Sequence, residues 1–429
     1  MTLNRARLLI GDSLWSPQTG LLRPAGGAAA VLDEDGEAIE TGPAASLIAK
    51  YPALPQDRGE GLLIPGLVDC HAHFECAVLA DQVPGGVGMA GWVKRLLQVR
   101  ATYTMEETEA AAREAARAMR ALGTVAVGDI CTILTTAPIL AEADLLGVSL
   151  LEIFAANDGE AKVALRDAKA RQEAAPATQA VDVRVVPHSP YGSPPATIRL
   201  LRHGGAAGSW APPAEDQGAP PSGERPQAKG APTDSAGADA ARTGATPAGA
   251  VEETAVGVRS IHAAEHADEV DWLVSGTGGF SPLLQSRGVV PPGTTPIRYL
   301  DSLGAIGAET LLVHMVMATA EELQIASKRG ATAVLCPRSN LHIGERLPDL
   351  PAIRAAGLSY VFGTDSLASS PNHDLLGEVR AIAAGYPEIP LDELLTAATT
   401  GGAAALGIRT HPWVRIDASR IPELFEEGR

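Results

Sequence analysis

The sequence predicts a protein of the α/β class, a (β/α)8 TIM barrel with a small β-domain formed by the N-terminal segment and a short C-terminal tail. The first observation is that eight apolar runs rich in β-branched residues, each bounded by turn residues, recur along the chain. They cover residues 62–70, 124–130, 148–154, 181–187, 256–261, 310–313, 332–336 and 358–363. Eight such units favour a closed barrel over an open sheet.

The second observation is that several segments between these runs carry helix signals. Thr104 followed by Glu107 forms a capping box before a helix expected over residues 106–122, and Gly123 ends that helix. Thr319 and Glu322 repeat the same device later in the chain. A strand, a crossover helix and another strand in succession are typical of a parallel sheet.

Composition divides the chain into a barrel and two further regions. We expect the barrel to cover residues 62–407 and the small β-domain to comprise residues 1–61 and 408–429, where short strands and turns are predicted. Residues 204–255 consist mainly of Ala, Gly, Pro, Ser and Thr. Because such a tract has few large apolar side chains to offset the entropy cost of ordering, we expect a disordered insertion within the barrel.

Overall composition excludes several kinds of partner. The net charge of −17 repels a phosphate backbone, and no basic stripe compensates for it. The four cysteines form no CxxC pair, and no window approaches the ~20 uninterrupted apolar residues of a membrane helix. We therefore expect a cytoplasmic protein that acts on a small molecule and binds neither nucleic acid nor a membrane.

The third observation is that residues able to bind a metal follow the predicted strands. They are His71 and His73 after the first strand, His188 after the fourth, His262 after the fifth, His314 after the sixth and Asp365 after the eighth. Loops at the carboxyl ends of barrel strands converge on one axis, so these residues are expected to lie close together. Imidazole and carboxylate ligands suit a borderline divalent metal such as zinc.

Each of these residues also has a plainer interpretation. A His-x-His pair alone fits two half-buried histidines bonded to backbone carbonyls, and His314 fits a satisfied core histidine on an apolar strand. Glu265 lies three residues after His262, close enough to carry a proton without binding the metal, but it also fits a first-turn glutamate favoured by the helix dipole. The clustering at strand ends favours the metal interpretation.

Other catalytic patterns are missing from the sequence. The His-x-Glu and Pro-Cys-x-x-Cys signature of cytidine deaminases is absent, as are a phosphate-binding glycine loop and a serine-hydrolase elbow. The fourth strand contains no lysine that could bridge two metals, so one metal is the simpler model.

Two segments carry the strongest pattern, Pro-Gly-Leu-Val-Asp-Cys-His-Ala-His at 65–73 and Gly-Thr-Asp-Ser-Leu-Ala-Ser at 363–369. Four further segments are His-Ser-Pro-Tyr at 188–191, Ser-Ile-His-Ala-Ala-Glu at 260–265, Ser-Gly-Thr-Gly-Gly-Phe at 275–280 and Cys-Pro-Arg-Ser-Asn-Leu at 336–341. These motifs resemble those of the amidohydrolase superfamily, in its deaminase and chlorohydrolase branch, and within it they most resemble the aminodeoxyfutalosine deaminases of the menaquinone pathway.

This resemblance implies a hydrolytic deaminase that uses one divalent metal, Zn2+ with Fe2+ as the alternative. The implied metal ligands are His71, His73, His262 and Asp365. Glu265 would carry the proton to the ring nitrogen, His314 would hold the attacking water, and Asp365 would accept the proton of that water. The residues expected to form the substrate pocket, for which packing or surface pairing are equally good explanations, are His188, Trp92, Glu75 and Arg338.

Several functions stay open at the level of the sequence. The expected substrate is an aminated purine-like ring, and aminodeoxyfutalosine is the first choice. S-adenosylhomocysteine, 5'-deoxyadenosine, guanine and chlorinated triazines are alternatives that need the same machinery. A catalytically silent metal-binding scaffold is an alternative of another class, although no proposed ligand or proton carrier is missing. The oligomeric state stays open, with a homodimer as one option.

Overall fold

The computed structural model describes residues 5–175, 178, 180–199 and 258–422. Eight parallel strands run through its centre in two sets of four, in the orders β8-β9-β10-β11 and β12-β13-β14-β15. Their bounds are β8 Leu67–Ala72, β9 Thr124–Cys131, β10 Leu146–Ile153, β11 Val181–Pro187, β12 Arg259–Ala263, β13 Thr310–His314, β14 Thr332–Leu335 and β15 Ser359–Phe362.

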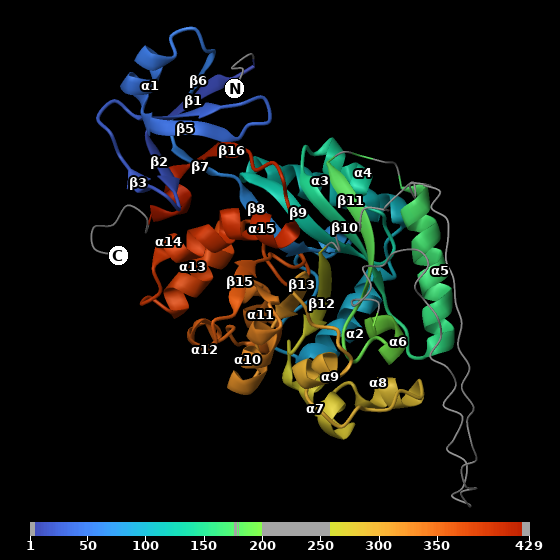
Figure 1. Cartoon of the computed structure of the whole chain (residues 1–429). Helices are drawn as coiled ribbons and strands as arrows, with labels where there is room; N and C mark the ends of the chain where they lie inside the picture. Colours follow the sequence, from blue (N-terminus) through green and yellow to red (C-terminus); the bar gives the residue numbers. More distant parts are fainter. Residues whose placement is uncertain (1–4, 176–177, 179, 200–257, 423–429) are drawn as a thin grey trace, which may run out of the picture.

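Backbone contacts join the two sets of strands at both seams. Asp365 forms a parallel bridge with Ala72, and its backbone N–H donates to the carbonyl of His71 at 2.9 Å. At the other seam the N–H of His262 donates to the carbonyl of His188 at 3.0 Å. The strands therefore close into a barrel, and the predicted fold class is confirmed (Figure 1).

Helices surround the barrel between successive strands (Figure 1). Their bounds are η1 Phe74–Leu79, α2 Met89–Arg100, α3 Met105–Ala121, α4 Ala137–Glu142, α5 Asp158–Ala174, α6 Pro195–Ile198, α7 Ala267–Ser275, α8 Ser281–Ser286, α9 Pro296–Ser302, α10 Ala320–Lys328, α11 Pro337–Gly344, α12 Leu350–Ala355, α13 Leu375–Gly385, α14 Leu391–Thr396, η3 Ala397–Gly401, α15 Gly402–Leu406 and η4 Ala418–Arg420. Both predicted capping boxes are present, at Thr104 before α3 and at Thr319 before α10.

The N-terminal segment forms two small sheets and one short helix. The elements are β1 Arg7–Gly11, β2 Ser13–Ser16, β3 Gly20–Leu22, β4 Ala28–Leu32, β5 Ala38–Pro43, α1 Ala44–Lys50, β6 Gln56–Arg58 and β7 Leu62–Pro65. One sheet has the order β5-β4-β1-β6, and the other has the order β16-β7-β2-β3. Strand β16, Trp413–Ile416, belongs to the C-terminal tail and pairs antiparallel with β7. The short tail thus supplies a strand to the small β-domain.

The first predicted strand, residues 62–70, is two strands that belong to different sheets. Gly66 separates β7 from β8, and a Cβ atom at this position would lie 2.4 Å from both methyl groups of Val125. The N–H of Gly66 also donates to the carbonyl of Pro412 at 2.8 Å. This close packing directs β7 into the sheet with β16 and β8 into the barrel. The domain division at residue 61 stays a prediction.

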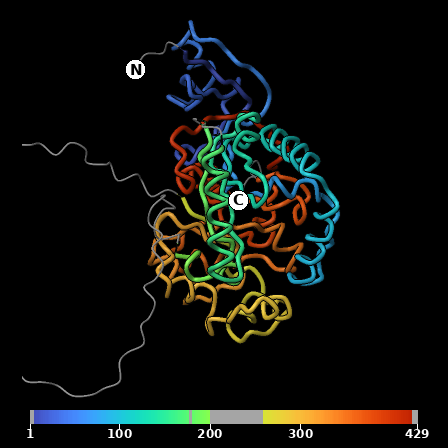
Figure 2. The backbone as a smooth tube through the Cα atoms, turned by 90° about the vertical axis from the view of Figure 1, so that its right-hand side faces the viewer, coloured from blue at the N-terminus to red at the C-terminus, as the bar shows by residue number. Residues whose placement is uncertain are grey.

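The small sheets and the carboxyl ends of the barrel strands lie at opposite ends of the molecule. Figures 1 and 2 show the small sheets at one end and helices α7 and α8, which follow β12, at the other. Across the contact between the two bodies, Trp15 Nε1 donates to Asp392 Oδ1 at 2.6 Å. Among the described residues, no helix combines the length and apolar character needed to span a bilayer. The predicted insertion at 204–255 lies outside the described residues.

Candidate metal centre

The predicted ligands lie at the carboxyl ends of three barrel strands. His71 is the second-to-last residue of strand β8, and His73 follows that strand directly. His262 lies in β12, and Asp365 follows β15. Parallel pairing of these strands therefore brings together residues that are up to three hundred positions apart in the sequence.

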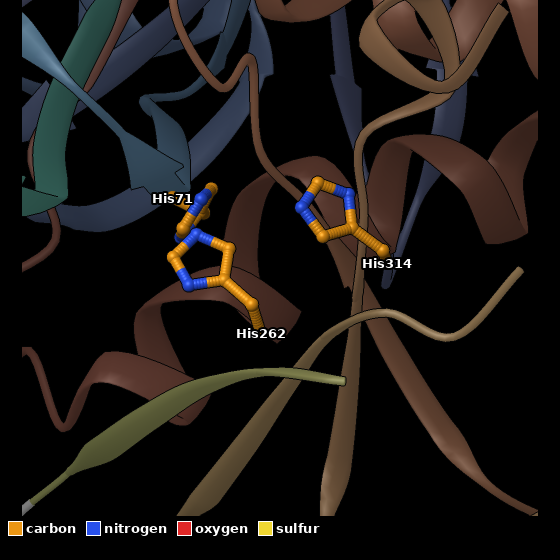
Figure 3. A group of neighbouring side chains, drawn as sticks. All are labelled: His71, His262 and His314. Atoms are coloured by element: carbon orange, nitrogen blue, oxygen red, sulfur yellow. The ribbon is translucent and has the colours of Figure 1, made fainter. Parts of the chain in front are cut away.

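Their ligand atoms converge on one point. His71 Nε2 and His73 Nε2 are 3.1 Å apart, and they lie 3.8 Å and 3.5 Å from Asp365 Oδ1. The ring centroids of His71 and His262 are 4.8 Å apart. Figure 3 shows these two rings side by side, with the His314 ring facing the same space. The proposed ligands thus surround a common position.

This donor set fits a divalent cation. Two nitrogens bound to one tetrahedral zinc ion lie about 3.3 Å apart, since each Zn–N bond is about 2.0–2.1 Å long. The 3.1 Å separation of the two Nε2 atoms is close to that value. His71, His73 and Asp365, and also His71, His262 and His314, form groups whose ligand atoms all lie within 4.8 Å of one another. The cluster is a histidine-rich metal site.

Unusual backbone conformations coincide with the site. His314, Met315, Ala264 and Asp365 have φ angles of 78°, 55°, 55° and 59°, in the left-handed region that side-chain-bearing residues rarely adopt. Hydrogen bonds hold this backbone in place: Met315 N–H donates to Ala263 O at 3.1 Å, and Met317 N–H donates to Ala264 O at 2.7 Å. Strain of this kind persists where the surrounding structure fixes a functional geometry.

Charges in the site favour an ionised Asp365 carboxylate. Burial raises its pKa, but the nearby imidazoles of His73 and His314 outweigh this and lower the pKa below its usual value. The hydroxyl of Ser339 donates to Asp365 Oδ2, which also stabilises the charged form. Asp365 can therefore serve as both a ligand and a proton acceptor.

Glu265 and His314 lie beside the ligands as a second pair of ionisable groups. His314 Nε2 is 3.5 Å from Glu265 Oε1, and both side chains are buried. Burial raises the pKa of the Glu265 carboxyl to about 8, although the His262 imidazole acts in the opposite direction. Burial also lowers the pKa of His314 to about 3. At neutral pH Glu265 thus holds a proton that it can give away, and His314 is neutral.

A cavity of about 210 Å³ adjoins this pair and is lined by Glu265, Asn340, Met317, Ile343 and Arg346 among others. A larger cavity, about 1350 Å³, lies at the opposite end of the barrel, beside the first residues of β14 and β15. The catalytic end of a barrel is formed by the loops that follow the strands. The smaller cavity, which Glu265 lines, lies at that end of the barrel.

Comparisons with known proteins agree with this architecture. Residues 236–411 match the model of the amidohydrolase family. The aminodeoxyfutalosine deaminase of Deinococcus radiodurans is 28% identical over 95% of this chain and 87% of its own length. The chain is thus similar to the amidohydrolase family over residues 236–411, and to this deaminase over nearly its whole length.

Solved structures show the same fold as this chain. The aminofutalosine deaminase of Helicobacter pylori, in complex with methylthio-coformycin, superposes with a TM-score of 0.71 at 19% identity, over 98% of this chain and 95% of that chain. An adenosine deaminase from Xanthomonas campestris with bound zinc gives a TM-score of 0.67 at 20% identity, over 96% and 83% of the two chains.

One of the predicted pocket residues, His188, lies beside the metal site, and another, Trp92, lies in an apolar cluster. The His188 ring is 5.0 Å from the His262 ring and 5.6 Å from the ring of Tyr191. Trp92 is buried in the apolar cluster that also contains Tyr191 and Phe280, and its Nε1 has no hydrogen-bond partner among the described residues. Their roles in substrate binding stay predictions.

The side chains of the other two predicted pocket residues form hydrogen bonds and ion pairs with other parts of the chain. Arg338 pairs with Glu378 on α13 at 2.6 Å and donates to the carbonyls of Asn372 and Asp374. Glu75 accepts hydrogen bonds from the backbone N–H groups of residues 132–134 and from Arg100. A role in binding substrate stays a prediction for both, but the structure shows that each fixes a loop.

We expect Glu75→Gln to lower the free energy of unfolding by about 2 kcal/mol, because a neutral amide cannot accept all of these charge-assisted hydrogen bonds. Urea denaturation, followed by circular dichroism, measures the difference. Glu114→Gln, at an exposed position on α3, is the control. A variant as stable as the unmodified protein would show that the contacts of Glu75 contribute nothing measurable.

The sequence analysis assigned no role to two polar residues that lie at the site. Glu152, near the end of β10, lies 3.2 Å from His262 Nδ1 through its Oε1 atom. Asn340, on α11, is 3.1 Å from His314 Nδ1. A single carboxylate near the carboxyl end of the apolar run at 148–154 was the signal for Glu152. Asn340 belongs to the Cys-Pro-Arg-Ser-Asn-Leu segment at 336–341, but that motif alone does not assign the asparagine a role.

Proposed function

We propose that this chain is an amidohydrolase, a metal-dependent aminodeoxyfutalosine deaminase that acts in menaquinone biosynthesis. The observation that carries the proposal is the position of Glu265, a buried carboxyl beside a cluster of three histidines and Asp365. Support for the substrate comes from the relative in Deinococcus radiodurans, which spans nearly the whole chain, and from the fold shared with the Helicobacter pylori enzyme. The cytoplasm is the proposed compartment, consistent with four buried, unpaired cysteines.

In the proposed mechanism His71, His73, His262 and Asp365 hold one divalent cation, Zn2+ with Fe2+ as the alternative. Bound zinc supplies a Lewis acid that lowers the pKa of water toward neutrality. Asp365 takes a proton from the attacking water, and the neutral imidazole of His314 orients that water by a hydrogen bond. Zinc is favoured because a structure of the same fold, the adenosine deaminase from Xanthomonas campestris, contains it.

Glu265 completes the proposed reaction. It gives its proton to the ring nitrogen next to the amino-bearing carbon, so that this carbon can accept the oxygen of water. The proton that Asp365 took from water then passes to the amino group, so that ammonia can leave, and the new hydroxyl group returns a proton to Glu265. The net change is the addition of water and the loss of ammonia. The raised pKa of Glu265 keeps the carboxyl protonated before the step.

A panel of aminated rings tests the proposed substrate. Ammonia release would be measured with aminodeoxyfutalosine, S-adenosylhomocysteine, 5'-deoxyadenosine and guanine, and chloride release with a chlorinated triazine. We expect the highest kcat/KM for aminodeoxyfutalosine, with one ammonia released per molecule. Faster turnover of another ring would reassign the substrate. Failure of the metal-loaded protein on the whole panel would favour the silent scaffold.

A further inference from the structure

Glu152 is a buried carboxylate on the outer side of the proposed metal site. It lies near the carboxyl end of β10, where its neighbour on β11 is Val186, and its exposed fraction is 7%. Its Oε1 atom is 3.2 Å from His262 Nδ1. Burying a carboxylate at this position costs desolvation free energy, and a strong hydrogen bond must offset that cost.

The surroundings of His262 determine which of its nitrogens carries the proton. Nδ1 is 3.0 Å from the carbonyl oxygen of His188 as well as 3.2 Å from Glu152. Both of these neighbours accept hydrogen bonds and neither can donate one in its usual form, so Nδ1 is the protonated nitrogen. Nε2 is then the nitrogen with a free lone pair, on a ring that lies 4.8 Å from the His71 ring (Figure 3).

We propose that Glu152 is a positioning residue that accepts a hydrogen bond from His262 Nδ1 and so directs Nε2 toward the metal. The inference rests on the metal site of the proposed function. Carboxylates that hold the outer nitrogen of a ligand histidine fix its tautomer and orientation and raise its basicity. By contrast, Nδ1 of His71 has no hydrogen-bond partner among the described residues. The outer nitrogen of His262 is therefore held by a carboxylate, whereas that of His71 is not.

A second arrangement competes with this one. Ligand atoms of Glu152, His188 and His262 lie within 4.8 Å of one another, as in a site for a second cation. Such a site needs an unprotonated His262 Nδ1, but two acceptors already surround that atom. The geometry therefore favours the positioning role, and the stoichiometry of metal binding separates the two arrangements.

Two variants of similar size test the proposal. Glu152→Gln keeps an oxygen that can accept from Nδ1, whereas Glu152→Leu removes it. We expect Zn2+ affinity of the metal-free protein, measured by competition with a chelator, to fall about 10–100-fold in the leucine variant and by less in the glutamine variant. Glu114→Gln, exposed on α3, serves as the matched control and should bind like the unmodified protein.

Nuclear magnetic resonance of the zinc-loaded, 15N-histidine-labelled protein gives a readout that does not depend on activity. We expect the Nδ1 proton of His262 to be protected from exchange with solvent. We also expect the resonance of this proton to shift in Glu152→Gln, because the acceptor has lost its charge. This readout decides the question even if circular dichroism shows that the leucine variant does not fold.

Three results would overturn the positioning role. They are an unshifted resonance in Glu152→Gln, unchanged affinity in a folded Glu152→Leu, or a second zinc equivalent that is lost in both variants. If the unmodified protein itself bound no zinc, the proposed metal site would fail instead, which is a separate outcome.

Discussion

Replacement of Glu265 by glutamine is expected to lower kcat by about 10²–10⁴-fold while the metal stays bound. The amide has nearly the same shape as the carboxyl but cannot give up the proton that the ring nitrogen requires. Glu265 lies 3.5 Å from His314 Nε2 through its Oε1 atom, and these two residues and Asp365 form a further group whose ligand atoms lie within 4.8 Å of one another. In the proposed mechanism Glu265 carries a proton and is not a ligand, so we expect the metal content to be unaffected.

Steady-state ammonia release and elemental analysis of the same preparations measure both quantities. The exposed Glu114→Gln variant should match the unmodified protein in both. Full turnover by Glu265→Gln would remove Glu265 from the proton path, whereas loss of the metal in this variant would make it a ligand.

Replacement of Asp365 by asparagine is expected to lower both metal affinity and turnover, the latter again by about 10²–10⁴-fold. Asp365 Oδ1 faces Nε2 of His71 and Nε2 of His73 at 3.8 Å and 3.5 Å. An amide in its place lacks the charge that attracts the cation and cannot accept the proton of water. Excess Zn2+ should restore metal content but not turnover.

Titration with Zn2+ and an activity assay at saturating metal separate the two effects. Asp144→Asn, at an exposed position between α4 and β10, is the matched control. If excess zinc restored full activity to Asp365→Asn, Asp365 would be a ligand only, and the proton acceptor would have to be another group.

Much of the barrel was predictable because local patterns and the global fold agree. The run at 181–187 coincides with β11, and the capping boxes at Thr104 and Thr319 mark the starts of two helices. The division of the run at 62–70 was not predictable, because it depends on contacts of Gly66 with Val125 and Pro412, which are distant in the sequence. Periodicity reports burial and cannot show which sheet a strand joins.

The metal site was predictable to the extent that its residues stand at strand ends. His71, His73, His262 and Asp365 follow apolar runs, and the geometry of a parallel barrel brings them together. Glu75 and Arg338 show the limit of this reasoning, since a polar residue near the site can equally hold a loop. Glu152 was missed because its proposed role is to orient the imidazole ring of His262, and spacing in the sequence does not encode that contact.

Anomalous X-ray diffraction from crystals of the zinc-loaded protein, recorded on both sides of the zinc absorption edge, tests the central claim most directly. We predict one strong peak per chain, in contact with the imidazoles of His71, His73 and His262 and with the carboxylate of Asp365. A peak elsewhere on the molecule, or a zinc ion from which any of these four side chains is turned away, would contradict the account.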